Sequence, residues 1–248
     1  TLSYSENHEQ AEWVHYTLNS NMIINNIDRT EDFRNDPNVS SGSASPSDYY
    51  KSGYDRGHLA PAGDMKANKT SMSESFYMSN MSPQNPSFNR GGWKKLESLV
   101  RSWALSDNLY IITAGILNDN FFKKIGPNNI SVPDKFYKVV FDVKENKMIA
   151  FVMPNQKIEQ PIQKYVVSVN EVEKLTGIDF FYEMDDEIEE RLESEISLNK
   201  WSFNSPSFSN SSSNSTSSAN ISVQCKGIAK SSGLRTSNLI IVFNIVIV

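Results

Sequence analysis

The sequence has little of several features that would place it in a particular class of protein. Its 248 residues include one cysteine, which excludes an intrachain disulfide framework and a multi-cysteine zinc site. No apolar run approaches the roughly 20 residues that cross a bilayer. A basic balance is also lacking, because 24 Lys and Arg face 29 Asp and Glu, giving a net charge of -5. This balance counts against a protein that binds nucleic-acid phosphates.

The charges are, however, unevenly distributed along the chain. Residues 51–101 carry eight basic and four acidic side chains, whereas residues 183–195 carry eight acidic side chains and one arginine. The local field matters more to a polyanion than the total charge does. Residues 51–101 therefore remain compatible with a nucleic-acid ligand. The acidic run is interpreted as the solvated face of a helix.

The pattern of apolar residues predicts an α+β domain. Short apolar runs favour four strands, the last two joined by a polar turn as a hairpin, at residues 13–18, 109–116, 136–143 and 148–153. Three- and four-residue spacing favours helices that begin near Gly92 and at residues 166–175 and 183–192. Residues 36–55 are rich in Ser, Pro, Gly and Asp and predict an ordered surface loop. Together these elements predict a largely antiparallel sheet flanked by helices.

The composition changes after residue 198. Residues 202–222 are dominated by Ser and Asn, which cannot bury enough apolar area to offset chain entropy, and they predict a flexible linker. The apolar run at residues 239–248 is too short to span a membrane, and it could be an edge strand, a sticky peptide or a non-native end. We therefore expect a folded domain at residues 1–198 and a flexible tail at residues 199–248. Because the chain starts at Thr1, we also expect a missing leader and a secreted or extracytoplasmic protein.

One of the three histidines lies in a segment that contains candidate catalytic residues. His8 and His15 have no acidic or metal-binding spacing around them, whereas His58 ends the tetrad Asp55-Arg56-Gly57-His58. An imidazole with an unperturbed pKa of about 6.5 can take a proton from water at neutral pH, so His58 is a candidate general base. A lone histidine is more often structural, and this interpretation needs support from other segments.

Two segments downstream give that support. They are Ser79-Asn80-Met81-Ser82-Pro83-Gln84 and the stretch from Asn89-Arg90-Gly91-Gly92-Trp93 to Glu97. In this order and spacing, the three segments resemble the DNA/RNA non-specific endonuclease family, the endonuclease G-like ββα-metal (His-Me finger) nucleases with a DRGH motif. The resemblance covers roughly residues 10 to 195 and leaves out the Ser/Asn-rich tail.

The resemblance implies a Mg²⁺-dependent endonuclease that hydrolyses phosphodiester bonds of DNA and RNA without sequence preference. His58 would be the general base, and Asn89 would hold a hydrated Mg²⁺, with Mn²⁺ or another divalent cation as alternatives. Mg²⁺ accepts so few protein ligands because it keeps several waters. Glu97 would accept hydrogen bonds from metal waters, Arg56 would stabilise charge in the transition state, and Asn80 would support the site. Family relatives are often dimers, so a homodimer is one expectation.

Weaker candidates for contact with substrate phosphates are Arg90, Lys66 and Arg34. The expected partner is DNA or RNA as substrate, and no membrane partner is expected. No zinc-finger or helix-turn-helix pattern for reading bases is visible in the sequence.

Each assignment has a plainer alternative. Asn89 could be only the N-cap of the following helix, Glu97 only a solvent-facing residue, and Asp55 is expected to hold loop geometry through backbone hydrogen bonds. A catalytically silent nucleic-acid-binding module is the main alternative function. The intact His58, Asn89 and Glu97 favour the enzyme. A different metal phosphoesterase is disfavoured, because that class usually needs several His and Asp ligands.

Overall fold

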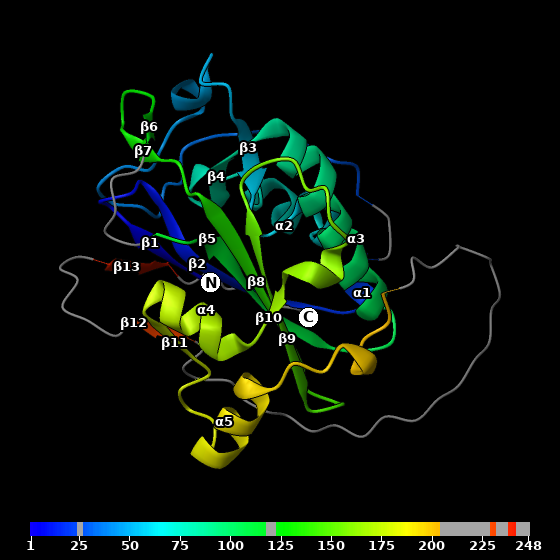
Figure 1. Cartoon of the computed structure of the whole chain (residues 1–248). Coiled ribbons are helices and arrows are strands. Elements are labelled where there is room, and N and C mark those ends of the chain that lie inside the picture. The colour runs from blue at the N-terminus through cyan, green and yellow to red at the C-terminus, as the bar shows by residue number, and fades with distance from the viewer. Residues whose placement is uncertain (24–26, 118–122, 204–228, 232–237, 242–248) are drawn as a thin grey trace.

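A seven-stranded antiparallel sheet forms the centre of the chain (Figure 1). The structure is a computed structural model, and it describes residues 1–23, 27–117, 123–203, 229–231 and 238–241. The strands, in their order across the sheet, are β10 (Val166–Val167), β9 (Lys147–Pro154), β8 (Lys135–Asp142), β5 (Leu109–Gly115), β2 (Gln10–Leu18), β1 (Leu2–Ser5) and β13 (Asn238–Ile241).

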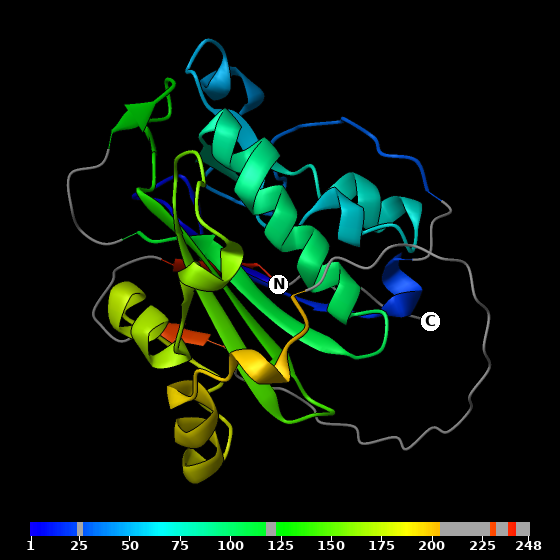
Figure 2. The same cartoon turned by 45° about the vertical axis from the view of Figure 1, so that its right-hand side comes forward.

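Helices cover both faces of this sheet (Figures 1 and 2). Helix α3 (Lys94–Trp103) crosses one face, and α4 (Val169–Thr176) and α5 (Asp186–Ser194) lie against the other. Neighbouring residues of β8 contact the two layers: the Phe136 ring lies 5.7 Å from Trp93, and the Tyr137 ring lies 5.8 Å from Phe180. Successive strand residues point to opposite faces, so one strand contributes to both layers of the core.

Shorter elements complete the described chain. They are α1 (Ser20–Ile23), η1 (Pro46–Tyr49), β3 (Asp55–His58), η2 (Ala62–Asp64), α2 (Lys69–Glu74), η3 (Met78–Asn80), β4 (Met81–Gln84), the π-helical turn η4 (Phe88–Trp93), β6 (Lys124–Ile125), β7 (Ile130–Ser131), η5 (Ile162–Tyr165), β11 (Ile178–Phe180), η6 (Leu198–Lys200) and β12 (Ala229–Ser231). No described helix is long and apolar enough to cross a membrane.

The four predicted strands are confirmed as β2, β5, β8 and β9, and β8 and β9 form the predicted hairpin. The helix predicted at residues 166–175 is wrong in its first turn, because Val166–Val167 pairs with β9 as β10. Helix α4 begins only after Ser168, whose side chain accepts a hydrogen bond from the Glu171 N–H. Asp185 caps α5 in the same way, so that helix begins at Asp186 and not at residue 183. In both places a capping side chain, which apolar spacing does not register, sets the start of the helix.

The predicted surface loop at residues 36–55 is ordered but partly buried. Asp36 is 2% exposed and accepts hydrogen bonds from Ser79 and Asn38. Asp48, 1% exposed in η1, accepts from the backbone and side chain of Asn128. These two buried carboxylates therefore hold the loop in place through the hydrogen bonds that they accept.

Beyond residue 198 the structure describes three short pieces. Trp201 is 6% exposed, and its ring lies 4.5 Å from that of Trp103 on α3. Strand β12 pairs with β11, and β13, which holds the start of the apolar run at 239–248, pairs with β1 at the sheet edge. The predicted linker at 202–222 lies outside the described residues except for its first two. The domain boundary at residue 198 stays a prediction.

Replacing Trp201 tests whether the chain just past residue 198 belongs to the core. We expect Trp201→Ala to lower the free energy of unfolding by about 3–5 kcal/mol, because it leaves a cavity beside Trp103. Urea unfolding at an unchanged m-value measures this. Leu198→Ala is the control, since Leu198 is 40% exposed, and its effect should stay within about 0.5 kcal/mol. Equal effects of the two changes would show that Trp201 is not packed.

Candidate active site

The first part of the candidate site is the antiparallel pair of β3 and β4, in which His58 lies opposite Met81. Arg56 and His58 are two residues apart on β3, so their side chains share one face of the strand. Both contact Phe33: the Arg56 guanidinium carbon lies 4.0 Å from the ring centroid, and the two ring centroids of Phe33 and His58 are 5.7 Å apart. The strand thus presents a cation and an imidazole side by side.

His58 is a buried, uncharged base. It is 9% exposed, and its ring meets Phe76 edge-on with 4.8 Å between centroids. Burial, followed by the positive charges of Arg29 and Arg56, lowers the pKa of His58 to about 3. Its Nε2 has no hydrogen-bond partner among the described residues. The imidazole is therefore neutral near pH 7 and has a nitrogen that can accept a proton.

Asn80 holds the backbone that follows His58. Its Nδ2 donates to the carbonyl oxygens of Ala60 and Ser75 at 2.9 and 2.8 Å, and its Oδ1 accepts from the Ala60 N–H at 2.9 Å. The backbone N–H of Leu59 donates to the Asn80 carbonyl at 3.0 Å. The Asn80 side-chain amide already makes hydrogen bonds through both its nitrogen and its oxygen. It therefore suits a residue that supports the site and not one that contacts substrate.

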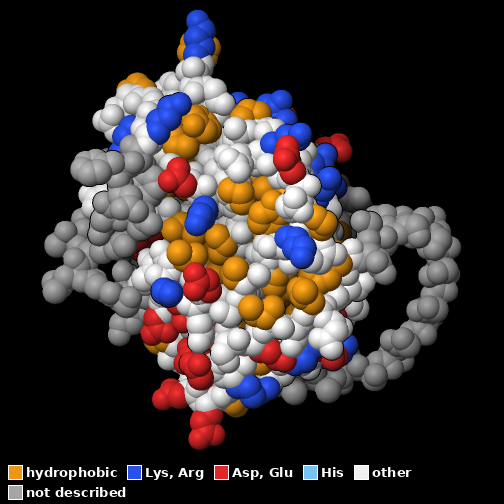
Figure 3. All heavy atoms as spheres, viewed as in Figure 1, with side chains coloured by type: hydrophobic (Ala, Val, Ile, Leu, Met, Phe, Trp, Pro, Cys, Tyr) orange, Lys and Arg blue, Asp and Glu red, His pale blue; other side chains and the backbone are white. Residues whose placement is uncertain are grey.

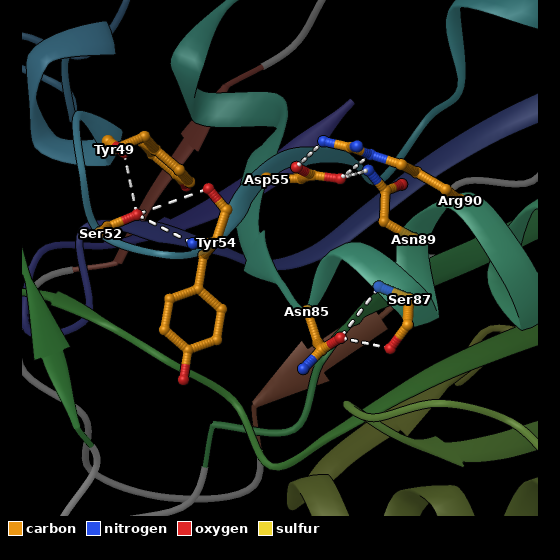
Figure 4. A network of polar contacts seen from close by, with 8 residues as sticks. All are labelled: Tyr49, Ser52, Tyr54, Asp55, Asn85, Ser87, Asn89 and Arg90. Carbon is orange, nitrogen blue, oxygen red and sulfur yellow. Dashed lines mark hydrogen bonds and ion pairs between the residues drawn. The ribbon is translucent and has the colours of Figure 1, made fainter.

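The second part of the site is the π-helical turn η4, which runs directly into α3. Asn89 lies inside this turn, and its N–H donates to the Asn85 carbonyl at 2.9 Å. The residue before this turn is Ser87, whose N–H and hydroxyl donate to the Asn85 side chain at 2.9 and 2.6 Å (Figure 4). The alternative that Asn89 is only an N-cap is therefore wrong. Turns of this kind are often found at functional sites.

Asp55 joins the strand pair to the helix (Figure 4). Its Oδ2 accepts from Asn89 Nδ2 at 2.9 Å, and its two oxygens accept from Arg90 Nε and Nη2 at 2.8 and 2.6 Å. In the part of the chain that the structure describes, the Asp55 carboxylate thus bonds to side chains, whereas the sequence led us to expect hydrogen bonds to the loop backbone. This hydrogen bond holds the side-chain amide of Asn89 through its nitrogen, Nδ2. The side-chain oxygen, Oδ1, is then available to coordinate a cation.

Glu97 lies on α3 and is half-buried, so the alternative that it is only a solvent-facing residue is wrong. In an α-helix a residue at i+8 lies about 80° around the axis from residue i. The wider turn of η4 covers less angle per residue, which brings Asn89 closer to the face of Glu97. Burial raises the pKa of Glu97, and the positive charge of Lys138 opposes this rise.

A polar network lies beside Glu97. Arg101, one turn further along α3, forms an ion pair of 2.6 Å with Asp64, and the Tyr16 hydroxyl donates to the same carboxylate at 2.9 Å. Arg101, Asp64 and Lys138 are not among the site residues predicted from the sequence. Lys138 could have been noticed as a single lysine within a predicted strand of apolar residues. Arg29 was also missed, although its charge acts on both His58 and Glu97.

The candidate substrate residues fall into two places. Lys66 and Arg90 line a groove of about 850 Å³ along α3, together with Lys94, Lys95 and Arg101. Arg34 does not line this groove. It pairs with Asp32 at 2.7 Å and lies over the Tyr77 ring at 4.2 Å. The other two histidines also lie elsewhere, since His8 bonds to Ser131 and His15 stacks on Tyr110.

Comparison with known proteins gives consistent matches. A model of the DNA/RNA non-specific endonuclease family matches residues 1–187. Nuclease C1 of Cunninghamella echinulata is 36% identical over 203 residues, covering 74% of this chain and 81% of that protein. The mitochondrial nuclease EXOG of zebrafish (Danio rerio) is 33% identical over 199 residues, covering 73% of this chain. The match spans only 58% of the zebrafish protein's own length.

A solved structure shows the same fold. It is a crystal structure of an EndoG/EndoGI complex, and the matched chain is 33% identical with a TM-score of 0.67. The match covers 74% of this chain and 83% of that one. The α+β ββα-metal nuclease fold with a largely antiparallel sheet is therefore confirmed. In this chain the antiparallel pair of β3 and β4, followed by α3, supplies the two strands and the helix of such a fold.

Gly57 is required by packing within the strand pair. A Cβ at this position would lie 2.2 Å from the side chain of Gln84, which is fully buried on β4. We expect Gly57→Ala to separate the strands and destabilise the protein by about 1–3 kcal/mol, measured by thermal unfolding. Gly91→Ala is the matched control in the same site, because its Cβ would meet nothing within 4 Å. A Gly57→Ala protein as stable as the control would contradict the packing argument.

Proposed function

This chain belongs to the DNA/RNA non-specific endonuclease family, and we propose from this that it hydrolyses phosphodiester bonds within DNA and RNA without reading base sequence. One observation supports the proposal above the others. Asp55, at the start of the strand that ends in His58, accepts a hydrogen bond from the Asn89 side chain, so one carboxylate ties the strand of the imidazole to the turn of the carboxamide. An imidazole and a hard oxygen ligand held by such a link can together activate water beside a phosphate.

His58 is proposed as the general base. Its neutral imidazole takes the proton from the attacking water as the new bond to phosphorus forms, and the aromatic contacts with Phe33 and Phe76 hold the ring in place. Arg56 is exposed on the same strand face, where its guanidinium can stabilise the additional negative charge of the transition state. Asn80 keeps the backbone beside His58 fixed.

The residues present fit a divalent cation held through few protein ligands. Among the described residues no group of three or more His, Cys, Asp or Glu could hold a metal ion, whereas the Asn89 carbonyl is the kind of hard oxygen donor that Mg²⁺ accepts. When bound, Mg²⁺, Mn²⁺ or another divalent cation would neutralise phosphate charge and assist the departing oxygen. Asp55 orients Asn89 for this task, and Glu97 accepts hydrogen bonds from water held in the site.

The groove along α3 is proposed to hold the nucleic-acid backbone. Lys66 and Arg90 lie on its lining beside Lys94 and Lys95, and contacts of this kind position phosphates without reading bases. Contact of Arg34 with substrate stays a prediction. A homodimer and secretion likewise stay predictions of the sequence, and the names of the curated relatives include mitochondrial proteins.

Cleavage assays with matched variants test the proposal. We expect the protein with Mg²⁺ to degrade plasmid DNA and RNA, EDTA to stop the reaction, and His58→Ala or Asn89→Ala to lower the rate by at least about a hundredfold. His15→Asn is the control, because it alters another buried histidine outside the site. Full activity of His58→Ala would remove the proposed base. Binding without any cleavage by the unaltered protein would favour the silent binding module.

The protonation of His58 gives a second test. The sequence alone predicts loss of the base below about pH 6, but burial lowers the pKa of His58 to about 3. Since this pKa is depressed, the neutral imidazole persists as the pH falls from 7 to 5. With three histidines in the chain, NMR titration of the imidazole signals, assigned with His58→Ala, can follow it. A His58 signal that titrates near pH 6.5 would contradict the buried environment.

A further inference from the structure

A lysine is buried beneath the candidate site. Lys138 lies on β8, is 0% exposed, and its Nζ has no hydrogen-bond partner among the described residues. The nearest aromatic groups are the rings of Trp93 and Tyr16, whose centroids lie 4.9 and 6.0 Å from Nζ. An ammonium in such surroundings is costly unless opposite charge compensates it. Lys138 therefore needs an anionic neighbour.

Two carboxylates act on Lys138, and only one of them lacks other partners. Asp64 accepts from Arg101 at 2.6 Å and from the Tyr16 hydroxyl at 2.9 Å. Glu97 forms no hydrogen bond with any described residue. Glu97 lies one helical turn after Trp93, whose ring centroid is 4.9 Å from Lys138 Nζ, and one turn before Arg101, which pairs with Asp64, so the same face of α3 lies over Lys138. In line with this placement, Glu97 is the carboxylate that most raises the pKa of Lys138, and Lys138 is the cation that most lowers the pKa of Glu97. The two side chains come from α3 and from the sheet beneath it.

We propose that Lys138 is a positioning residue that keeps Glu97 ionised and directed toward the catalytic face of α3. The inference rests on the proposed function, in which Glu97 must be a carboxylate to accept hydrogen bonds from water in the site. Lys138 touches neither substrate nor the reacting atoms, and it acts only through Glu97. No other described element supplies Glu97 with a fully buried cation, since Arg101 lies 22% exposed and is already paired with Asp64.

The charges around Glu97 support this role. Burial raises the pKa of Glu97, while Lys138, then Arg101 and Arg29, lower it and Asp64 raises it. Burial lowers the pKa of Lys138, and Glu97 and Asp64 raise it. Desolvation is the main factor that disfavours the ionised form of Glu97, and the charge of Lys138 is the main factor that favours it. Loss of the Lys138 charge therefore raises the pKa of Glu97, and the carboxylate is then lost at a higher pH than in the unaltered protein.

A purely structural role is disfavoured by the position itself. Lys138 stands in a strand between Tyr137 and Val139, within the core, where an unbranched apolar residue of similar length would pack without a charge. Replacing buried charges by apolar residues is often neutral or stabilising. A lysine at this place costs stability, which is expected where a residue serves the site and not the fold.

The test compares Lys138→Met with Lys147→Met in the whole protein. Lys147 is the matched control, because it also lies over an indole, that of Trp201 at 4.6 Å, and pairs with Asp142, and neither residue lines the groove. We expect Lys138→Met to fold at least as stably as the unaltered protein. Its acidic limb of kcat/KM should move to higher pH, with roughly a tenfold loss at fixed pH for each unit of movement. Lys147→Met should leave the limb unchanged.

A readout without catalysis separates failure of this inference from failure of the proposed function. The ¹³Cδ NMR signal of Glu97, assigned by its loss in Glu97→Gln, should titrate at higher pH in Lys138→Met than in the unaltered protein. An unchanged Glu97 midpoint, or an equal loss of activity at every pH, would overturn the inference. Should the unaltered protein be inactive, the NMR shift still decides whether Lys138 controls Glu97. Lys138→Gln, which removes the charge but keeps a polar end, replaces Lys138→Met if the latter does not fold.

Discussion

One carboxylate connects the two halves of the candidate site. Asp55 begins β3, and its oxygens accept hydrogen bonds from Asn89 and, in a paired geometry, from Arg90. Bidentate pairs of this kind define direction as well as distance. Because Asp55 is three residues before His58 on the same strand, the angle between strand and helix also sets where the base lies relative to Asn89. The pair is largely exposed on the arginine side, so its contribution is geometry more than stability.

Buried ionisable groups are common in this protein, and their surroundings distinguish them. On α4 and α5, burial and mutual repulsion raise the pKa of Glu173 and Glu189 to about 7 and that of Glu193 to about 9. No cation is among the main causes there, and none of the three residues lines the groove along α3. His58 and Glu97 differ because each combines burial with the positive charge of nearby side chains. A perturbed pKa therefore indicates a functional site only where a specific charged neighbour accompanies burial.

Sequence patterns predicted the parts of the fold that follow from apolar spacing, and missed those that depend on side-chain partners. The runs that became β5, β8 and β9 are apolar enough to be recognised alone, and His58 was found from its tetrad. The π turn around Asn89 has no distinct spacing, because the same residues would suit an α-helix. Asp55 and Lys138 gain their roles from residues 34 and 41 positions away, at Asn89 and Glu97, and no local pattern carries that information.

The overall negative charge does not oppose a nucleic-acid substrate, because the densest acidic run and the basic groove lie on different sides of the sheet. Acidic side chains gather at the end of the molecule where α5 lies (Figure 3), whereas the groove of basic residues runs along α3 on the other face. A polyanion is repelled from the first region and attracted to the second, so the acidic helix favours approach from the α3 side. The net charge of -5 averages over this asymmetry. A phosphate backbone responds to the local charge of the surface that it approaches, and not to the net charge of the protein.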